Sequence, residues 1–447
     1  SQTLSGHSFL LSNVMKANYK KKNGGVADLE WKASFVDKRG VLNVSETKMS
    51  QLLRQRNFQS EATGSLLAFT IPHLMFNLNG KVMFDWQRVS AGLNSLSDAS
   101  GSEQKTWLLG AFVSPKILLH FGNRLQWLVY VPVGVKYYHS ADGSLDYDKR
   151  FFSTCPYSNL TYKPTGRLSF DLTTICEESM PSVLSQMVLK HYVNYRTTMS
   201  NPHQVEIAPN RSVKLAFTSS YKDIIKMLFG GVTLSYVDAR NGNSMGYQVV
   251  DDVVNYIVQP QSTKNRVWQI EQMVSKGFFQ WNSKISESLS IGTSRSEYYV
   301  GGDCHDGRSD YLQPKISYVA SVRKWLNLSI SNDYSVSKPY TDGKASGEVY
   351  RTFMNASSFT FWLGKQLNVV PSVQYYHNNY FSSGRNNVFL NTVMEYYWGN
   401  ATLSLKCTNL LDSRTFHRII DNGITRYSGE YQLRGRTILF GIRIKII

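Results

Sequence analysis

Polar and apolar side chains alternate one by one along the last segment of the chain, FGIRIKII at 440–447. Successive side chains of a β-strand point to opposite faces, so this segment predicts a strand with two unlike faces. One face carries Phe440, Ile442, Ile444 and Ile446, and the other carries Gly441, Arg443 and Lys445.

The same period of two recurs along the whole chain, whereas the period of 3.6 that marks amphipathic helices is scarce. In 401–408, for example, Leu403 and Leu405 alternate with Ser404 and Lys406. The pattern therefore predicts a chain built almost entirely of β-strands. Further alternating segments are 26–35, 167–173, 212–218, 325–331 and 367–374.

Short and long connections alternate between these strands, which is typical of outer-membrane β-barrels. Tight turns are predicted at KNGG (22–25), NLNGK (77–81), FGNR (121–124), KPTG (163–166), VRKWLN (322–327), LGKQL (363–367) and WGN (398–400), with looser ones near 221–231 and 276–281. Long polar stretches fill 39–62, 92–104, 140–155, 177–206, 238–264, 292–313, 336–349, 378–387 and 410–430.

These nine short turns imply eighteen strands, and the terminal strand makes nineteen. We therefore expect an all-β fold, a large antiparallel transmembrane outer-membrane β-barrel of about 18–22 strands, with short periplasmic turns and long extracellular loops. Because 447 residues show no linker or low-complexity tract, residues 1–447 are expected to form a single domain.

The cost of burying charge in lipid predicts which face points outward. A slip of one residue would turn Arg443 and Lys445 to the lipid, at about 2–4 kcal/mol each near mid-bilayer. Ile442, Ile444 and Ile446 are therefore expected to face lipid. Glu287 shares the outward parity of its apolar neighbours and needs a bulge or a position at the rim.

Composition narrows the class of protein. Aromatic residues reach 13%, an excess that suits strands and interfaces. The longest apolar runs, such as 107–113, are far shorter than the ~20 residues of a membrane helix. Net charge is +17, but the basic residues are scattered singly, without a clustered helix or zinc-ligand spacing, so nucleic acid is not an expected partner.

Basic residues at inward positions could favour an anionic solute. Equally, any barrel lumen is polar, and basic residues near the outer rim could contact lipopolysaccharide phosphates. No phosphate loop, paired-carboxylate site or nucleophile elbow occurs, so we expect no enzyme activity, cofactor or metal. The expected lumen-facing residues are Lys32, Lys136, Arg167, Lys214, Lys406, Arg443 and Lys445.

Four cysteines lack the spacing of a metal site. Cys155 and Cys176 flank the KPTG turn almost symmetrically, so they could face each other across a hairpin and form a disulfide. Cys304 lies with His305 and Asp306 in GGDCHDGRSD (301–310). Three adjacent residues converge poorly into a catalytic triad, and this stretch is interpreted as a polar surface loop.

Near the C-terminus, CTNLLDSRTF (407–416) resembles the segment that closes the penultimate strand of TonB-dependent outer-membrane receptors. Its core is Asn409, Leu410, Leu411 and Asp412, followed by a long loop and a last strand, RGRTILFGIRIKII (434–447). The resemblance implies a 22-stranded barrel with a plug domain and a TonB box. Neither the plug nor the TonB box is recognised in this chain, and Ile447 stands where most such barrels end in an aromatic residue.

The resemblance implies TonB-dependent uptake of a nutrient, such as an iron chelate, cobalamin, a glycan or a peptide, in the outer membrane of a Gram-negative bacterium. Implied partners are outer-membrane lipid and lipopolysaccharide, the plug domain, the TonB complex and a surface lipoprotein, the last as in receptors of the SusC type. The alternative is a plugless barrel, acting as a passive channel or as a structural subunit of an outer-membrane complex. An outer-membrane enzyme is a third class.

Overall fold

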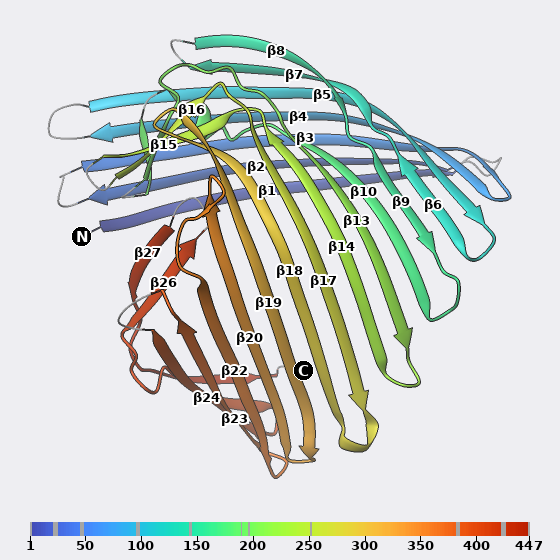
Figure 1. Cartoon of the computed structure of the whole chain (residues 1–447), viewed down its shortest axis with the longest axis vertical. Coiled ribbons are helices and arrows are strands. Elements are labelled where there is room, and N and C mark those ends of the chain that lie inside the picture. The colour runs from blue at the N-terminus through green and yellow to red at the C-terminus, as the bar shows by residue number, and fades with distance from the viewer. Residues whose placement is uncertain are drawn as a thin grey trace.

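The computed structural model describes residues 2–20, 26–44, 49–94, 99–142, 145–188, 190–194, 197–250, 253–380, 385–421 and 426–445. One curved sheet holds 26 strands, and its wall runs through nineteen antiparallel positions (Figure 1). In spatial order these are β1 (Gln2–Lys20), β2 (Val26–Val44), β3 (Met49–Ile71), β4 (Leu74–Asn94), β5 (Ala99–Phe121), β6 (Leu125–Tyr130) with β7 (Val133–Asp142), β8 (Leu145–Thr154) with β9 (Tyr157–Tyr162), β10 (Leu168–Ser179), β13 (Asn210–Asp223), β14 (Leu228–Asn241), β17 (Thr263–Phe278), β18 (Ser283–Val300), β19 (Asp303–Arg323), β20 (Leu326–Thr341), β22 (Tyr350–Leu363), β23 (Leu367–Asn378), β24 (Asn386–Trp398), β25 (Ala401–Thr408) and β28 (Thr437–Ile444).

The other elements lie in the connections between wall strands. They are η1 (Val183–Gln186), β11 (His191–Asn194), β12 (Thr197–Ser200), β15 (Ser244–Val250), β16 (Val253–Gln259), η2 (Phe279–Trp281), β21 (Lys344–Ala345), β26 (Thr415–Asp421) and β27 (Arg426–Gln432). Among the described residues, no helix combines the length and the apolar character needed to span a bilayer.

The two ends of the sheet are open within the described residues. β1 pairs only with β2, and β28 pairs only with β25. Both edge strands run toward the rim that carries the short turns. β1 has the same direction as β3, with only β2 between them, and β28 has the same direction as β24, with only β25 between them. Antiparallel pairing between β1 and β28 is therefore impossible.

The outer face is apolar and exposed, as the alternation predicts. Val82, Val135 and Ile270 are 52%, 51% and 46% exposed, although their strands lie in the middle of the sheet. Ile442 and Ile444 are likewise exposed, and Ile446 lies outside the described residues. Such a surface is satisfied by lipid rather than water.

Aromatic side chains gather at the short-turn rim on the outside. Phe121, Phe279, Trp281, Trp325 and Trp398 all lie in or beside short turns and are 50–71% exposed. Aromatic rings favour the boundary between headgroups and hydrocarbon. This girdle marks one edge of the membrane-spanning band.

One predicted turn is wrong. NLNGK (77–81) lies inside β4, and the turn between β3 and β4 is at Pro72 and His73, where His73 has a φ of 81°. Asn-Gly is a strong local turn signal, but Gly80 pairs on both sides with Gly64 and Val113 in an unbroken ladder. Pairing with two neighbouring strands outweighs the local preference. The KNGG turn lies outside the described residues.

Most of the predicted long polar stretches are continuations of strands beyond the membrane. β3 has 23 residues, about twice the 9–11 that a tilted strand needs to cross a bilayer. The stretch 301–310 is likewise a turn at Gly301 and Gly302 followed by the start of β19. Among the described residues, separate elements occur in 177–206, 238–264 and 410–430, and 336–349 adds the two-residue β21, which pairs with β20.

Two adjacent wall strands are interrupted at the same level. The break between β6 and β7 contains Pro132, and that between β8 and β9 contains Pro156. Neither proline has an N–H for the ladder. Around the breaks, the Val131 N–H donates to the Pro115 carbonyl and the Cys176 N–H to the Pro156 carbonyl, both at 3.1 Å.

Glu287 lies on the outer face, opposite Ile316 and Val274, and the ladder of β18 contains no bulge there. Glu287 lies four residues after the start of β18, near the short-turn rim. Of the two expected explanations for an outward carboxylate, a bulge or a rim position, the structure has the rim position.

Opposite substitutions at neighbouring positions test the assignment of faces. Leu234→Arg on the outer face of β14 should lower the free energy of unfolding by about 2–4 kcal/mol, measured by urea titration in lipid vesicles. Ser235→Arg, one residue along and facing the lumen, should change it by less than about 1 kcal/mol. Equal losses at both positions would contradict the assignment.

Candidate functional site

The connection between β10 and β13 folds back against the inner wall near the long-loop rim. This inward segment comprises the described residues 180–188, 190–194 and 197–209 and contains η1, β11 and β12. Its strand β12 pairs with β16, which Figure 1 labels together with β15. Val183 and Met187 pack on Val89 of β4, and all three are at least 96% buried. They form the dry apolar cluster of the described lumen.

Buried polar contacts tie the inward segment to the wall. The Gln51 side chain of β3 makes two bonds to the Tyr192 backbone, donating to its carbonyl at 2.8 Å and accepting from its N–H at 2.6 Å. The Gln186 carbonyl oxygen accepts from the Tyr138 hydroxyl and, at 3.0 Å, from that of Ser140. Because buried polar groups are costly when unpaired, these bonds specify one position of the segment.

The far side of the segment is held by the β15–β16 hairpin. β12 pairs in parallel with β16, and the hydroxyl of Thr198 donates to the Asn255 side chain at 2.6 Å. The Ala208 N–H donates to the Asn243 side chain at 2.8 Å. The segment thus spans the mouth from β3 to the connections above β14 and β17.

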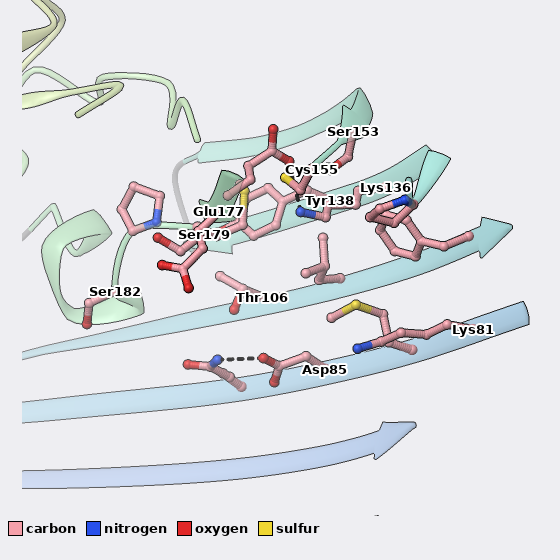
Figure 2. A pocket seen from close by; sticks show the side chains of 18 of the residues that line it. Lys81, Asp85, Thr106, Lys136, Tyr138, Ser153, Cys155, Glu177, Ser179 and Ser182 are labelled. Atoms are coloured by element: carbon pink, nitrogen blue, oxygen red, sulfur yellow. Dashed lines mark hydrogen bonds and ion pairs between the residues drawn. The ribbon is translucent and has the colours of Figure 1, made fainter. Parts of the chain in front are cut away.

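Two cavities flank the segment. One, of about 660 Å³, lies between its first residues and the inner faces of β4, β5, β7 and β10 (Figure 2). The other, of about 490 Å³, is lined by residues such as Asn241, Ser244 and Tyr298. In Figure 2 the labelled residues that line the larger cavity include Lys81 and Asp85 of β4, Lys136 and Tyr138 of β7, and Glu177 of β10.

The charges around the larger cavity are mostly paired. Glu178 binds Lys136 and Arg211, each at 2.8 Å, and its side chain is 2% exposed. Lys81 pairs with Glu61 at 2.8 Å. Asp85 accepts hydrogen bonds from Gln59 and Gln87 instead of a cation.

The larger cavity can bind a polar solute through hydrogen bonds. No group of His, Cys, Asp and Glu that could hold a metal ion occurs among the residues that the structure describes.

The predicted basic residues are spread around the barrel rather than gathered. Lys136 is the one that lines the larger cavity, where it is bound to Glu178. Arg167 lies at a short turn, 3.2 Å from Asp223. The others alternate along their strands with apolar neighbours, and their orientation toward the lumen stays a prediction. They are Lys32, Lys214, Lys406 and Arg443, with Lys445 following the end of β28.

Cys155 and Cys176 lie next to each other where β8 gives way to β9. Both are free thiols here, and the Cys176 thiol is 3.9 Å from the Thr154 carbonyl oxygen. Their adjacency agrees with the hairpin argument, and the disulfide itself stays a prediction. Cys304 is exposed, and His305 binds Asp342 through Nδ1 at 2.8 Å.

The Asn409–Asp412 motif fastens the ends of three strands. Asn409, with a φ of 52°, accepts the Ser413 N–H at 2.9 Å and donates to the Ser413 and Arg434 carbonyls at 2.8 and 3.0 Å. The Leu410 N–H donates to the Leu390 carbonyl of β24 at 2.8 Å. Leu411 is 53% exposed.

Asp412 makes the remaining contacts of this motif, and we call the contacts of Asn409–Asp412 together the clasp. The Asp412 carboxylate accepts the Arg436 N–H at 2.9 Å and the Arg414 guanidinium at 3.0 and 2.9 Å. The motif therefore holds β24, β25 and the start of β28 in register, which is a structural role.

The inward segment was not anticipated, because 177–206 was expected to be an extracellular loop. A signal existed in PSVLSQMVL (181–189), where Val183, Leu184 and Met187 are apolar at helical spacing within a polar stretch. Its wall contacts are out of reach of sequence reasoning, since Gln51 and Tyr192 are 141 residues apart.

No protein-family model and no curated protein match the chain. Solved structures do. The copper transporter OprC matches over 99% of this chain and 79% of its own, with a TM-score of 0.59 and 10% identity. The Serratia marcescens hemophore receptor HasR, solved as a double mutant with its hemophore HasA and heme, matches over 97% of this chain and 71% of its own, with a TM-score of 0.52 and 10% identity.

These matches confirm the predicted fold, a large antiparallel outer-membrane β-barrel. The apolar outer face and the aromatic girdle fit the same environment. Fold and surface together place the chain in the outer membrane of a Gram-negative bacterium.

Removing the Gln51 side chain should loosen the inward segment. Gln51→Ala deletes two buried bonds to Tyr192, and a loss of about 1–3 kcal/mol would raise local opening about fivefold to a hundredfold. Trypsin cleavage after the exposed Lys190, followed by mass spectrometry in detergent micelles, measures this opening. Gln313→Ala, which breaks only a bond to Asp333 within the wall, should leave the rate unchanged. Equal rates in all three proteins would refute the anchoring.

The clasp at Asp412 should weaken in acid. The Arg436 N–H and the Arg414 guanidinium hold the pKa of Asp412 below its usual value. The folded state therefore binds this proton less readily than the unfolded chain. Its stabilisation is complete above the unfolded pKa of about 4 and is lost as pH falls through the lower folded pKa.

Asp412→Asn should accordingly lower the free energy of unfolding at pH 7 and reduce the further loss on acidification to pH 3, both measured by urea titration in micelles. Asp303→Asn, at an exposed carboxylate with no ion pair among the described residues, is the control and should follow the wild type. An unchanged pH dependence in Asp412→Asn would disprove the role of this carboxylate.

Proposed function

We propose that the protein is an outer-membrane receptor and transporter barrel for TonB-dependent uptake of a nutrient. The observation that supports this proposal most strongly is that the inward segment occupies the long-loop end of a wide barrel. Nineteen strand positions curve around a broad lumen, yet the inward segment lies across its long-loop end, with cavities of about 660 and 490 Å³ beside it. An anchored segment across the mouth favours a selective or gated path over free diffusion.

Two further observations support the proposal. The barrel shares its fold with a copper transporter and a hemophore receptor. The clasp at Asn409–Asp412 occupies the position at which the sequence resembles TonB-dependent receptors. On this proposal a plug domain gates the lumen, TonB delivers the energy, and a surface lipoprotein assists if the receptor is of the SusC type.

The cargo classes to test follow from the sequence resemblance and the neighbours. They are ferric chelates, haem, copper, cobalamin, glycans and peptides. The alternative, a plugless barrel serving as a passive channel or as a structural subunit, gains support from basic residues that alternate with apolar neighbours along their strands, such as Lys32, Lys214 and Lys406.

Energy dependence separates these functions. Bacteria carrying the native locus are compared with a locus deletion and a TonB deletion for uptake of a labelled panel of those six cargo classes. The proposal predicts saturable uptake of one class, reduced at least tenfold by either deletion. Uptake that is linear in concentration and indifferent to TonB would favour the passive channel, and no change on deleting the locus would favour the structural subunit.

A further inference from the structure

Three arginines from neighbouring strands stand directly opposite one another on the outer face of the barrel. Arg266 of β17 pairs with Arg295 of β18, and Arg295 pairs with Arg308 of β19. Neighbouring strands are about 4.8 Å apart, and like charges at such positions repel. A row of this kind lowers stability unless an anion neutralises it.

Register and exposure place this arginine row on the lipid side. Along β17, Arg266 shares its face with Trp268 and Ile270, which are 59% and 46% exposed. Along β18, Arg295 shares its face with Ile291, which is 42% exposed. Figure 1 shows β17, β18, β19 and β20 side by side in this part of the wall.

The height of the row matches the far boundary of the membrane. Arg266 lies twelve residues before Phe278, which ends β17 beside the aromatic girdle. Twelve residues span about 40 Å along a strand, or about 29 Å of height at a tilt of about 45°. The apolar band of such barrels is about 25 Å tall, so the row stands just beyond it, at the level of the outer-leaflet headgroups.

An apolar groove lies directly below the row. It measures about 690 Å³, and its walls are mainly Trp268, Ile270, Ile291, Leu312 and Val336 from four strands. Its upper end carries Asp310 and Lys338, which are register partners. A ligand with acyl chains and an anionic head would place its chains in the groove and its head on the arginines.

The acidic residues nearby only partly neutralise the row. Asp310 binds Arg308 with both carboxylate oxygens, at 2.9 and 2.6 Å, while Asp238 is 3.6 Å from Arg266. In the described part of the chain Arg295 has no ion pair within 4.0 Å, and Asp310 interacts with it at longer range. Arg308 and Lys338 both lie over the Tyr340 ring, at 5.1 and 5.3 Å, which fixes their positions.

Farther out, Glu297 and Asp306 stand opposite each other, so the positive charge is confined to one level.

We propose that this groove and arginine row bind a phosphorylated, multiply acylated glycolipid of the outer leaflet, of the lipid A type. Guanidinium groups bind phosphate through paired, charge-assisted hydrogen bonds, and Arg295 is free to make them. The inference requires the barrel to be in the outer membrane, and it does not depend on which cargo is transported.

Lipid retention by the purified full-length protein tests the site. The barrel is exchanged into micelles containing lipid A, washed, and the retained lipid is counted by mass spectrometry. The wild type should retain about one molecule, and Arg266→Gln with Arg295→Gln should retain at least fivefold less. Arg124→Gln with Arg323→Gln removes the same charge at the short-turn rim and should retain the wild-type amount. Loss below twofold, or an equal loss in the control pair, would overturn the proposal.

Competition separates a lipid site from a simple anion site. Dephosphorylated lipid A and the deacylated headgroup should each be retained at least fivefold less than lipid A, and millimolar inorganic phosphate should not displace the lipid. Displacement by inorganic phosphate alone would show a free-anion site and overturn the lipid assignment.

Thermal unfolding distinguishes binding from a structural role. In lipid-free micelles Arg295→Gln should be as stable as the wild type or more so, because it removes repulsion, and lipid A should raise the unfolding temperature of the wild type more than that of the variant. Lower stability without lipid would point to a structural arginine. If the double variant fails to insert, Arg295→Gln alone gives the same readouts.

Discussion

A peptide group that enters hydrocarbon without a hydrogen-bond partner costs several kcal/mol, and this constraint governs the whole molecule. It favours a paired neighbour on both sides of every strand in the membrane, so the chain adopts one continuous antiparallel ladder. Among the described strands of the wall, only the edge strands β1 and β28 are paired on a single side. Once the ladder is set, side chains have only two directions to take. Apolar side chains face the lipid and polar side chains face the lumen, which explains why polar and apolar residues alternate through nearly every strand.

The same constraint explains where packing is concentrated. A barrel of this width has no interior shared by all its strands, so most inner side chains meet water or one another across the ladder. The dry cluster of Val89, Val183 and Met187 exists only because the inward segment brings a second layer to the wall. Polar ties such as Gln51–Tyr192 and Tyr138–Gln186 then fix that layer in place. Obstruction of the mouth therefore depends on polar specificity more than on apolar area.

Features that follow from local period were predictable, and features that follow from distant pairing were not. The alternation in 401–408 and 440–447 was sufficient to assign faces, and the rhythm of turns was sufficient to anticipate nineteen strands. The Asn-Gly signal at 79–80 misled because pairing with two neighbours overrides a local turn preference. The arginine row could not be predicted for the same reason. Arg266 and Arg308 are far apart in sequence and are brought to the same level because each pairs with Arg295. Charge patterns across strands become visible only after pairing is known.

The shared direction of the two edge strands has a consequence for crowding in the membrane. Copies of a barrel are inserted with a single orientation, so any edge that meets another copy's edge, β1 or β28, would run alongside it rather than against it. Strand pairing between copies would have to be parallel. Among the described strands, parallel pairing occurs only in the short β12–β16 and β15–β18 pairs, which involve strands of the connections. Pairing between the edges of two copies of the described sheet is thereby limited to parallel registers.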